Sequence, residues 1–206
     1  MSKSLYSLIL NDELVALVDR QAMRSGSNRS GMINRIIAEY FGVMTPEKEL
    51  EALLDSISSL VGENVELVPV SSPKNSTVSF KSSLNVKYRP TVKYDVSLYR
   101  TESGTDGTLT VYFRTQSAAL LEVLEEFFGE FAECEKDNGI KAEHTLENGK
   151  FTRSIMLPSG ISMVEAGEKI KNFINVLDYL MKDYVEYRNP EKMNESYKKM
   201  FGIGEE

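Results

Sequence analysis

The apolar residues between positions 14 and 41 recur at helical spacing in two groups. The first group consists of Leu14, Leu17, Val18 and Ala22. The second group consists of Ile33, Ile36, Ile37, Tyr40 and Phe41. Asn11 and Asn28 precede the groups at the positions of N-caps. Gly26 and Gly42 follow them, as glycines follow helix ends. The pattern predicts two short helices joined by a turn.

A short apolar and β-prone segment, residues 3–10 (KSLYSLIL), leads directly into the first of these helices. A module of one strand and two short helices is too small to bury its apolar faces alone, and a lone strand has no ladder partner for its backbone groups. We therefore expect residues 1–44 to form a module that dimerises.

The third helix begins at Thr45, Pro46 and Glu47, which suit the N-cap and first turn. Its apolar stripe consists of Leu50, Leu53, Leu54, Ile57 and Leu60. We interpret residues 45–62 as a linker helix between the N-terminal module and the rest of the chain.

From Val65 onward the alternation of apolar and polar residues is typical of strands. Strands are predicted over residues 65–70, 76–89, 91–100, 107–115, 140–146 and 150–157, and long helices over 117–139 and 161–185. The order hairpin, helix, hairpin, helix indicates a possible ββα repeat. We expect an α+β domain over residues 63–188, with a mostly antiparallel sheet, two long helices on one face, and the other face free for a dimer partner or ligand. Residues 189–206 are expected to be a tail with one more helical stretch and a frayed end.

Composition narrows the class of protein. The chain has 206 residues, 41% of them hydrophobic, and a formal net charge of -7, so binding to DNA or anionic membrane through bulk charge is not expected. Residues 1–42 nevertheless carry a surplus of one positive charge. The opening MSKSLYSLILNDE reaches acidic residues too early for a signal peptide, and no apolar run is long enough for a membrane span. We expect a cytoplasmic protein.

The motif Gly26-Ser27-Asn28-Arg29-Ser30, followed by the apolar rhythm of the second helix, resembles the ribbon-helix-helix family of DNA-binding proteins, the Arc/MetJ type. The resemblance covers residues 3–42, about a fifth of the chain, and does not extend to the C-terminal domain. It implies a homodimer in which two strands pair and lie in the major groove.

The resemblance also implies which residues contact DNA. The outward-facing strand residues would be Leu5, Ser7 and Ile9, where the family commonly has polar or basic side chains. Leu5 and Ile9 offer only apolar contact, chiefly to thymine methyl groups, and Ser7 alone can hydrogen-bond a base. A phosphate clamp is expected at the start of the second helix, formed by Asn28, Arg29 and Ser30 and supplemented by Lys3.

Other candidate sites have simpler explanations. One cysteine, Cys134, and one histidine, His144, make a disulfide or a zinc site improbable, and we expect Cys134 on a helix-packing surface and His144 solvated in a turn. The run of glutamates over residues 122–135 is interpreted as a solvated helix face. The run over residues 87–94 (KYRPTVKY) is compatible with base stacking or anion binding, but we favour a half-exposed strand.

No phosphate-binding glycine loop, nucleophile elbow or metal-ligand spacing is present, so we expect no catalytic residues, no metal and no cofactor. The leading hypothesis is a homodimeric transcriptional regulator, a repressor, whose C-terminal domain adds oligomerisation or binds an effector or a protein. One alternative is an antitoxin-like interaction scaffold whose ribbon does not contact DNA. Another is a DNA-segregation adaptor, and the sequence does not separate it from the regulator.

Overall fold

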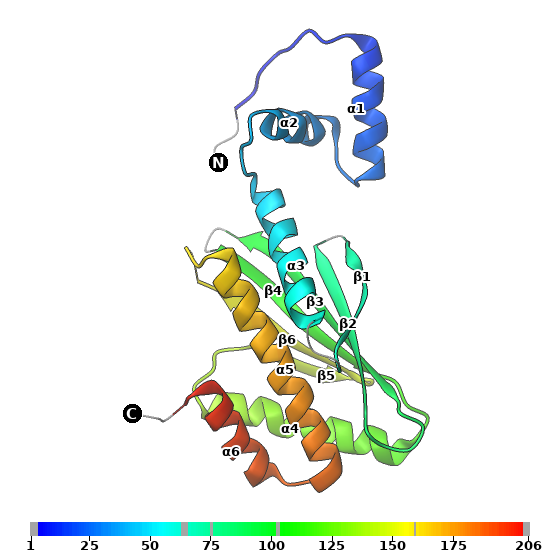
Figure 1. The fold of residues 1–206 in the computed structure, drawn as a ribbon, viewed down its shortest axis with the longest axis vertical. Helices are drawn as coiled ribbons and strands as arrows, with labels where there is room; N and C mark the ends of the chain where they lie inside the picture. The colour runs from blue at the N-terminus through cyan, green and yellow to red at the C-terminus, as the bar shows by residue number, and fades with distance from the viewer. Residues whose placement is uncertain (1–3, 63–65, 75, 102–103, 159, 204–206) are drawn as a thin grey trace. The chain divides into compact units, whose positions relative to one another are not determined.

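The computed structural model of the chain describes residues 4–62, 66–74, 76–101, 104–158 and 160–203 (Figure 1). The chain divides into two compact units, Met1–Lys48 and Glu49–Glu206. The boundary between the units falls inside helix α3 (Pro46–Gly62).

The N-terminal unit contains the two predicted helices, α1 (Asp12–Arg24) and α2 (Arg29–Tyr40). Asn11 caps α1, because its side-chain oxygen accepts a hydrogen bond from the Glu13 backbone N–H at 2.8 Å. Gly26 and Gly42 have φ of 64° and 65°, the left-handed conformation that glycine adopts readily after a helix. The two helices and their ends are therefore confirmed.

The strand predicted over residues 3–10 does not form in the single chain. Residues 4–10 have no regular secondary structure, and Leu5, Ser7 and Ile9 lie in this irregular stretch. A strand needs a neighbour to pair its backbone N–H and C=O groups, and within the described residues no other part of the unit supplies one. The alternation of faces expected for Leu5, Ser7 and Ile9 is therefore absent in this isolated state.

The second unit is an α+β fold with a six-stranded antiparallel sheet in the order β1-β2-β3-β4-β6-β5. The strands are β1 (Val68–Lys74), β2 (Thr77–Ser83), β3 (Thr91–Thr101), β4 (Gly104–Phe113), β5 (His144–Glu147) and β6 (Lys150–Leu157). The helices that follow α3 are α4 (Ala118–Asp137), α5 (Met163–Tyr187) and α6 (Pro190–Phe201). The order of two strands and a helix occurs twice, as β3-β4-α4 and β5-β6-α5.

One of the central predicted strands is shorter than expected. The strand predicted over residues 76–89 ends at Ser83, and residues 84–90 form a loop. Tyr88 and Arg89 have φ of 70° and 44°, which a strand does not allow. In the run 87–94 only the part from Thr91 onward is strand, so the interpretation of the whole run as strand is wrong.

One face of the sheet is covered and forms the core. Alternate residues of the central strands are almost completely buried: Val78, Phe80, Val92, Tyr94, Val96, Leu109, Val111 and Phe151. They share one hydrophobic cluster with Phe127, Phe128 and Phe131 of α4 and with residues of α5, which crosses the sheet in Figure 1. The alternate positions on the other face, such as Lys93 and Thr110, are less buried. The pattern is that of an antiparallel sheet with one covered and one open face.

The helix α6 belongs to this core. Asn189 caps it, since its side-chain oxygen accepts from the Lys192 N–H at 3.0 Å. Met193 and Tyr197 are buried, at 3% and 2% exposure. The helical stretch predicted after residue 189 is therefore confirmed, and it packs on the domain through residues that sequence analysis had assigned to a tail.

Candidate functional site

The segment expected to read DNA is fully accessible. Leu5 and Ile9 have the exposure of free side chains, 100% and 104%, and Ser7 is exposed as well. Lys3, expected to supplement the phosphate clamp, lies outside the described residues. With this exposure, the side chains of Leu5 and Ile9 are not packed against the start of α2.

The helices of the N-terminal unit also leave much apolar surface uncovered. Ala22, Met32 and Ala38 are its buried hydrophobic residues. The exposed large ones are Tyr6, Leu8, Leu10, Leu14, Leu17, Met23, Ile36, Ile37, Tyr40, Phe41, Val43 and Met44, besides Leu5 and Ile9. Scattered apolar residues are normal at a surface, but so many in one small unit make a large uncovered apolar surface.

The start of α2 has the geometry of an anion site. The Asn28 side-chain oxygen accepts from the Gly31 backbone N–H at 2.8 Å, which closes the N-cap. The backbone N–H groups of Arg29 and Ser30, at the first two helical positions, have no acceptor inside the helix. Arg29 and Ser30 are exposed, so an anion can approach these groups and the positive end of the helix dipole.

Arg29 itself is engaged within the chain. Its guanidinium donates two hydrogen bonds to the Asp19 carboxylate of α1, from Nε at 2.8 Å and from Nη2 at 2.6 Å. This pair lowers the pKa of Asp19 and raises the pKa of Arg29, in both cases mainly through the side-chain hydrogen bond. Both side chains are about half exposed, so water screens the pair and a competing anion can displace Asp19 at small cost.

Sequence reasoning missed two other cations of this unit. Arg20 and Arg24 stand one helical turn apart on α1 and are exposed, and neither forms an ion pair with a described residue. By contrast, Arg35 and Lys48 both pair with Glu39. The spacing of four residues between Arg20 and Arg24 was the available signal, because it places both on one side of a helix.

In the second unit the structure shows a buried charge cluster around Glu135. The Glu135 carboxylate is completely buried. It accepts from Arg153 Nε at 2.7 Å and Nη2 at 2.9 Å, and from the Tyr197 hydroxyl at 3.1 Å. His144 Nε2 lies 2.7 Å from Oε2, and because a carboxylate only accepts, this nitrogen carries the hydrogen. The expectations of a solvated His144 and a solvated Glu135 are wrong.

The cluster was detectable only in part from the sequence. Glu135 follows Phe128 and Phe131 by seven and four residues, which places it on the apolar side of α4. Arg153 lies two residues after the buried Phe151 and two before Ile155 along β6. Since every second residue of a strand points to the same face, Arg153 points to the buried face of the sheet. Nothing in the sequence shows that these two charges meet.

This cluster has the character of a structural ion pair. The side chains of His144 and Arg153 are each 14% exposed, and His144 Nε2 and all three Arg153 guanidinium nitrogens already have hydrogen-bond partners. Arg153 also lies over the ring of Phe173, with its guanidinium carbon 4.3 Å from the ring centroid. Among the described residues, no group of three or more His, Cys, Asp or Glu is arranged to hold a metal ion.

A second buried polar group joins α5 to the sheet. The Asp178 carboxylate accepts from the Tyr94 hydroxyl at 2.8 Å, from Ser82 at 3.1 Å and from Lys182 at 2.7 Å. Burial, with the neighbouring Asp178, raises the pKa of Tyr94 well above its ordinary value. The expected placement of Cys134 is confirmed, because it is 5% exposed and part of the core.

The chain was compared with family models, curated proteins and solved structures. No family model matches it, and neither a curated protein nor a solved structure shows significant similarity. None of the described helices is both long and apolar enough to span a membrane.

Proposed function

We propose that the chain is a homodimeric DNA-binding protein, a transcriptional regulator whose N-terminal unit docks in the major groove. The observation that carries the proposal is the uncovered apolar surface of that unit beside an accessible helix start. The resemblance of residues 3–42 to ribbon-helix-helix proteins explains both features at once, because that fold is complete only as a dimer.

The partner that fits the N-terminal unit is a second copy of the same chain. Residues 4–10 belong to no helix or strand in the single chain and have a β-prone sequence, so two copies can pair antiparallel into a ribbon. Pairing two units would also cover the apolar residues of α1 and α2, such as Leu17, Ile36 and Ile37. The strand that is absent in the single chain would then form on association.

DNA would be held mainly by phosphate contacts. The N–H groups at the start of α2 suit a phosphate, and Arg29 can exchange its exposed Asp19 partner for a phosphate oxygen. Arg20 and Arg24 supply further positive charge in the same unit. Local contacts of this kind are compatible with a chain whose net charge is -7.

The test measures fluorescence anisotropy of labelled DNA from upstream of the protein's own gene, and of random DNA, at two salt concentrations. The full-length wild type should bind its upstream DNA preferentially and lose affinity as salt rises, because phosphate binding releases counterions. Arg29→Ala should weaken binding, whereas Asp19→Asn should strengthen it by freeing Arg29. Lys141→Ala, an exposed lysine of the second unit, is the control and should change nothing.

A second candidate function is a protein-interaction scaffold in which the ribbon does not contact DNA. The observation that favours it is the full exposure of Leu5 and Ile9, whose apolar side chains suit a protein surface better than base edges. In that case the chain still dimerises, but it binds neither the upstream DNA nor the random DNA, even at low salt. That outcome would reject the DNA-binding proposal and retain the dimer.

A further inference from the structure

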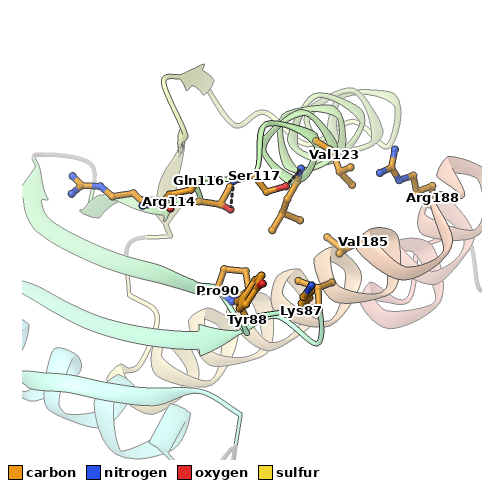
Figure 2. A pocket seen from close by; sticks show the side chains of 13 residues that line it. Lys87, Tyr88, Pro90, Arg114, Gln116, Ser117, Val123, Val185 and Arg188 are labelled. Atoms are coloured by element: carbon orange, nitrogen blue, oxygen red, sulfur yellow. Dashed lines mark hydrogen bonds between the residues drawn. The ribbon is translucent and has the colours of Figure 1, made fainter.

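A cavity of about 720 Å³ lies in the second unit, between the start of α4 and the end of α5 (Figure 2). Its third side is the 84–90 loop that sequence analysis had assigned to a strand. Ligand sites for small molecules commonly have volumes of about 300–1,000 Å³. The cavity is therefore large enough for a ligand with several rings.

The lining of this cavity has an apolar floor and a cationic border. Val86, Leu120, Val123 and Val185 supply aliphatic surface, and Tyr88 supplies an aromatic ring. Lys87, Arg114 and Arg188 supply positive charge, and no Asp or Glu is among the lining residues. In a chain with seven more acidic than basic residues, a lining with three cations and no acid is a local reversal of charge.

The three cations have no anionic partner among the described residues. Neither Lys87, Arg114 nor Arg188 forms an ion pair there, and Lys87 instead lies over the ring of Tyr88, 5.1 Å from its centroid. Some other basic residues of this unit do have a carboxylate partner, as Lys182 has Asp178. The cations around the cavity are thus available to an external anion.

Their positions around the cavity differ. Figure 2 shows Lys87 and Val185 on the side of the loop and α5, with Arg188 near the end of α5, and Ser117 and Val123 on α4. The Arg114 guanidinium is directed away from the cavity in this view. Lys87 and Arg188 are therefore the two cations on which the argument depends.

We infer that this cavity binds a small organic anion with an apolar ring system and a carboxylate or phosphate group. The ring system would occupy the aliphatic floor beside Tyr88, and the anionic group would lie between Lys87 and Arg188. The inference does not depend on DNA binding by the N-terminal unit. If both hold, the cavity is where an effector would enter the C-terminal domain.

The test uses 1-naphthyl phosphate as a fluorescent probe, titrated with the full-length protein. 1-Naphthylacetate distinguishes a carboxylate from a phosphate preference, and 1-naphthalenemethanol is the neutral analogue. Binding of either anion that exceeds binding of the neutral analogue supports the inference. Equal binding of all three compounds, or no binding of the anions, overturns it.

Variants locate the bound probe. Lys87→Gln and Arg188→Asn remove the charges, and asparagine suits position 188 because Arg188 has the left-handed φ of 48°. Each variant should weaken binding of the anionic probe by about tenfold, the loss expected for one hydrogen bond to a charged group. Lys141→Gln, an exposed lysine beyond the other end of α4, is the matched control.

The outcomes are distinct from those of the DNA experiment. Unchanged probe affinity in both charge variants would overturn the assignment of this site, even if the protein binds the probe elsewhere. Circular dichroism of each variant checks that the fold is retained. If a variant loses its fold, Leu120→Trp provides a second measurement, because it fills the cavity from the exposed end of α4 and should abolish probe binding.

Discussion

Glu135 of α4 and Arg153 of β6 form a two-pronged ion pair inside the core, with the nitrogen to oxygen distances at 2.7 and 2.9 Å. The pair joins a helix to a strand that is 18 residues away in the sequence. His144 and Tyr197 complete the shell around the carboxylate, so four elements, α4, β5, β6 and α6, meet at one charged group.

Removing one partner of this pair should destabilise the second unit strongly. Glu135→Gln leaves the Arg153 guanidinium buried without a compensating charge, which should cost about 3–5 kcal/mol of the free energy of unfolding. The measurement is urea denaturation followed by circular dichroism. Glu133→Gln is the matched control, since Glu133 is on the same helix but two-thirds exposed, and it should change stability little.

Removing both charges separates the cost of an unpaired charge from the value of the pair. The double variant Glu135→Leu with Arg153→Met should be more stable than Glu135→Gln alone, because no charge is left buried without a partner. If the double variant loses as much stability as the two single changes added together, the two charges do not act as a pair.

Gly107 and Gly129 should respond to alanine in opposite directions. A Cβ at Gly107 of β4 would lie 2.3 Å from the Ser97 carbonyl oxygen of the neighbouring strand, so Gly107→Ala must displace backbone and should destabilise by about 1–3 kcal/mol. A Cβ at Gly129 of α4 meets nothing within 4 Å. Gly129→Ala should therefore stabilise the helix by about 0.5–1 kcal/mol. The same urea denaturation checks both, and a loss of stability in both variants would contradict the packing around Gly129.

The sequence predicts those elements of the fold that are determined by residues close together in the chain. The helices α1, α2, α4 and α5 follow from apolar periodicity and capping residues, which act within a few positions. The turn at Asn148 and Gly149 is equally local, since both residues have positive φ as a two-residue hairpin requires. Elements with local causes were therefore predicted well.

Features with distant causes were not predicted. The strand at residues 4–10 needs a partner strand that the single chain lacks. The loop at residues 84–90 departs from its alternating pattern because the chain reverses between β2 and β3, with Tyr88 and Arg89 in left-handed conformations. The glutamate run was assigned to solvent, yet the Glu135 position depends on Arg153, which no local pattern places beside it.

In the candidate functional site, too, the features with local causes were predicted and those with distant causes were not. Asn28 as a cap and an accessible start of α2 follow from a short motif. The engagement of Arg29 by Asp19 joins two helices across the turn between them, and the sequence analysis did not foresee it. The cavity beside α4 combines three separate segments, so only the three-dimensional structure brings Lys87 and Arg188 to one site.

The single thiol should make stability depend on pH in the alkaline range. Burial is the main cause that raises the pKa of Cys134 from 9.0 to about 11. The unfolded thiol therefore ionises at a lower pH than the folded one, so its contribution to stability is present below pH 9 and is lost as the pH rises through about 11. Buried tyrosines such as Tyr184, whose pKa is raised to about 12, act in the same direction.

The Cys134→Ala variant isolates the contribution of the thiol. Its free energy of unfolding should fall less steeply than that of the wild type over this alkaline range, while the tyrosine contribution remains in both. At neutral pH the wild-type thiol should react slowly with 5,5′-dithiobis(2-nitrobenzoate) and quickly once urea unfolds the protein. Rapid labelling of the folded protein would show that the thiol is accessible, contrary to its 5% exposure.

The uncovered apolar surface of the N-terminal unit predicts that Ile37→Glu abolishes association. Ile37 is 46% exposed in the single chain, and a dimer that covers it would have to bury a carboxylate without a partner. Sedimentation velocity should show a dimer for the wild type and a monomer for the variant. Val164→Glu is the control, because Val164 is 69% exposed on α5 of the second unit and should leave the dimer intact. A dimer that persists in Ile37→Glu but dissociates in Val164→Glu would place the interface in the second unit. The proposal that residues 4–10 of two copies pair as strands would then lose its basis.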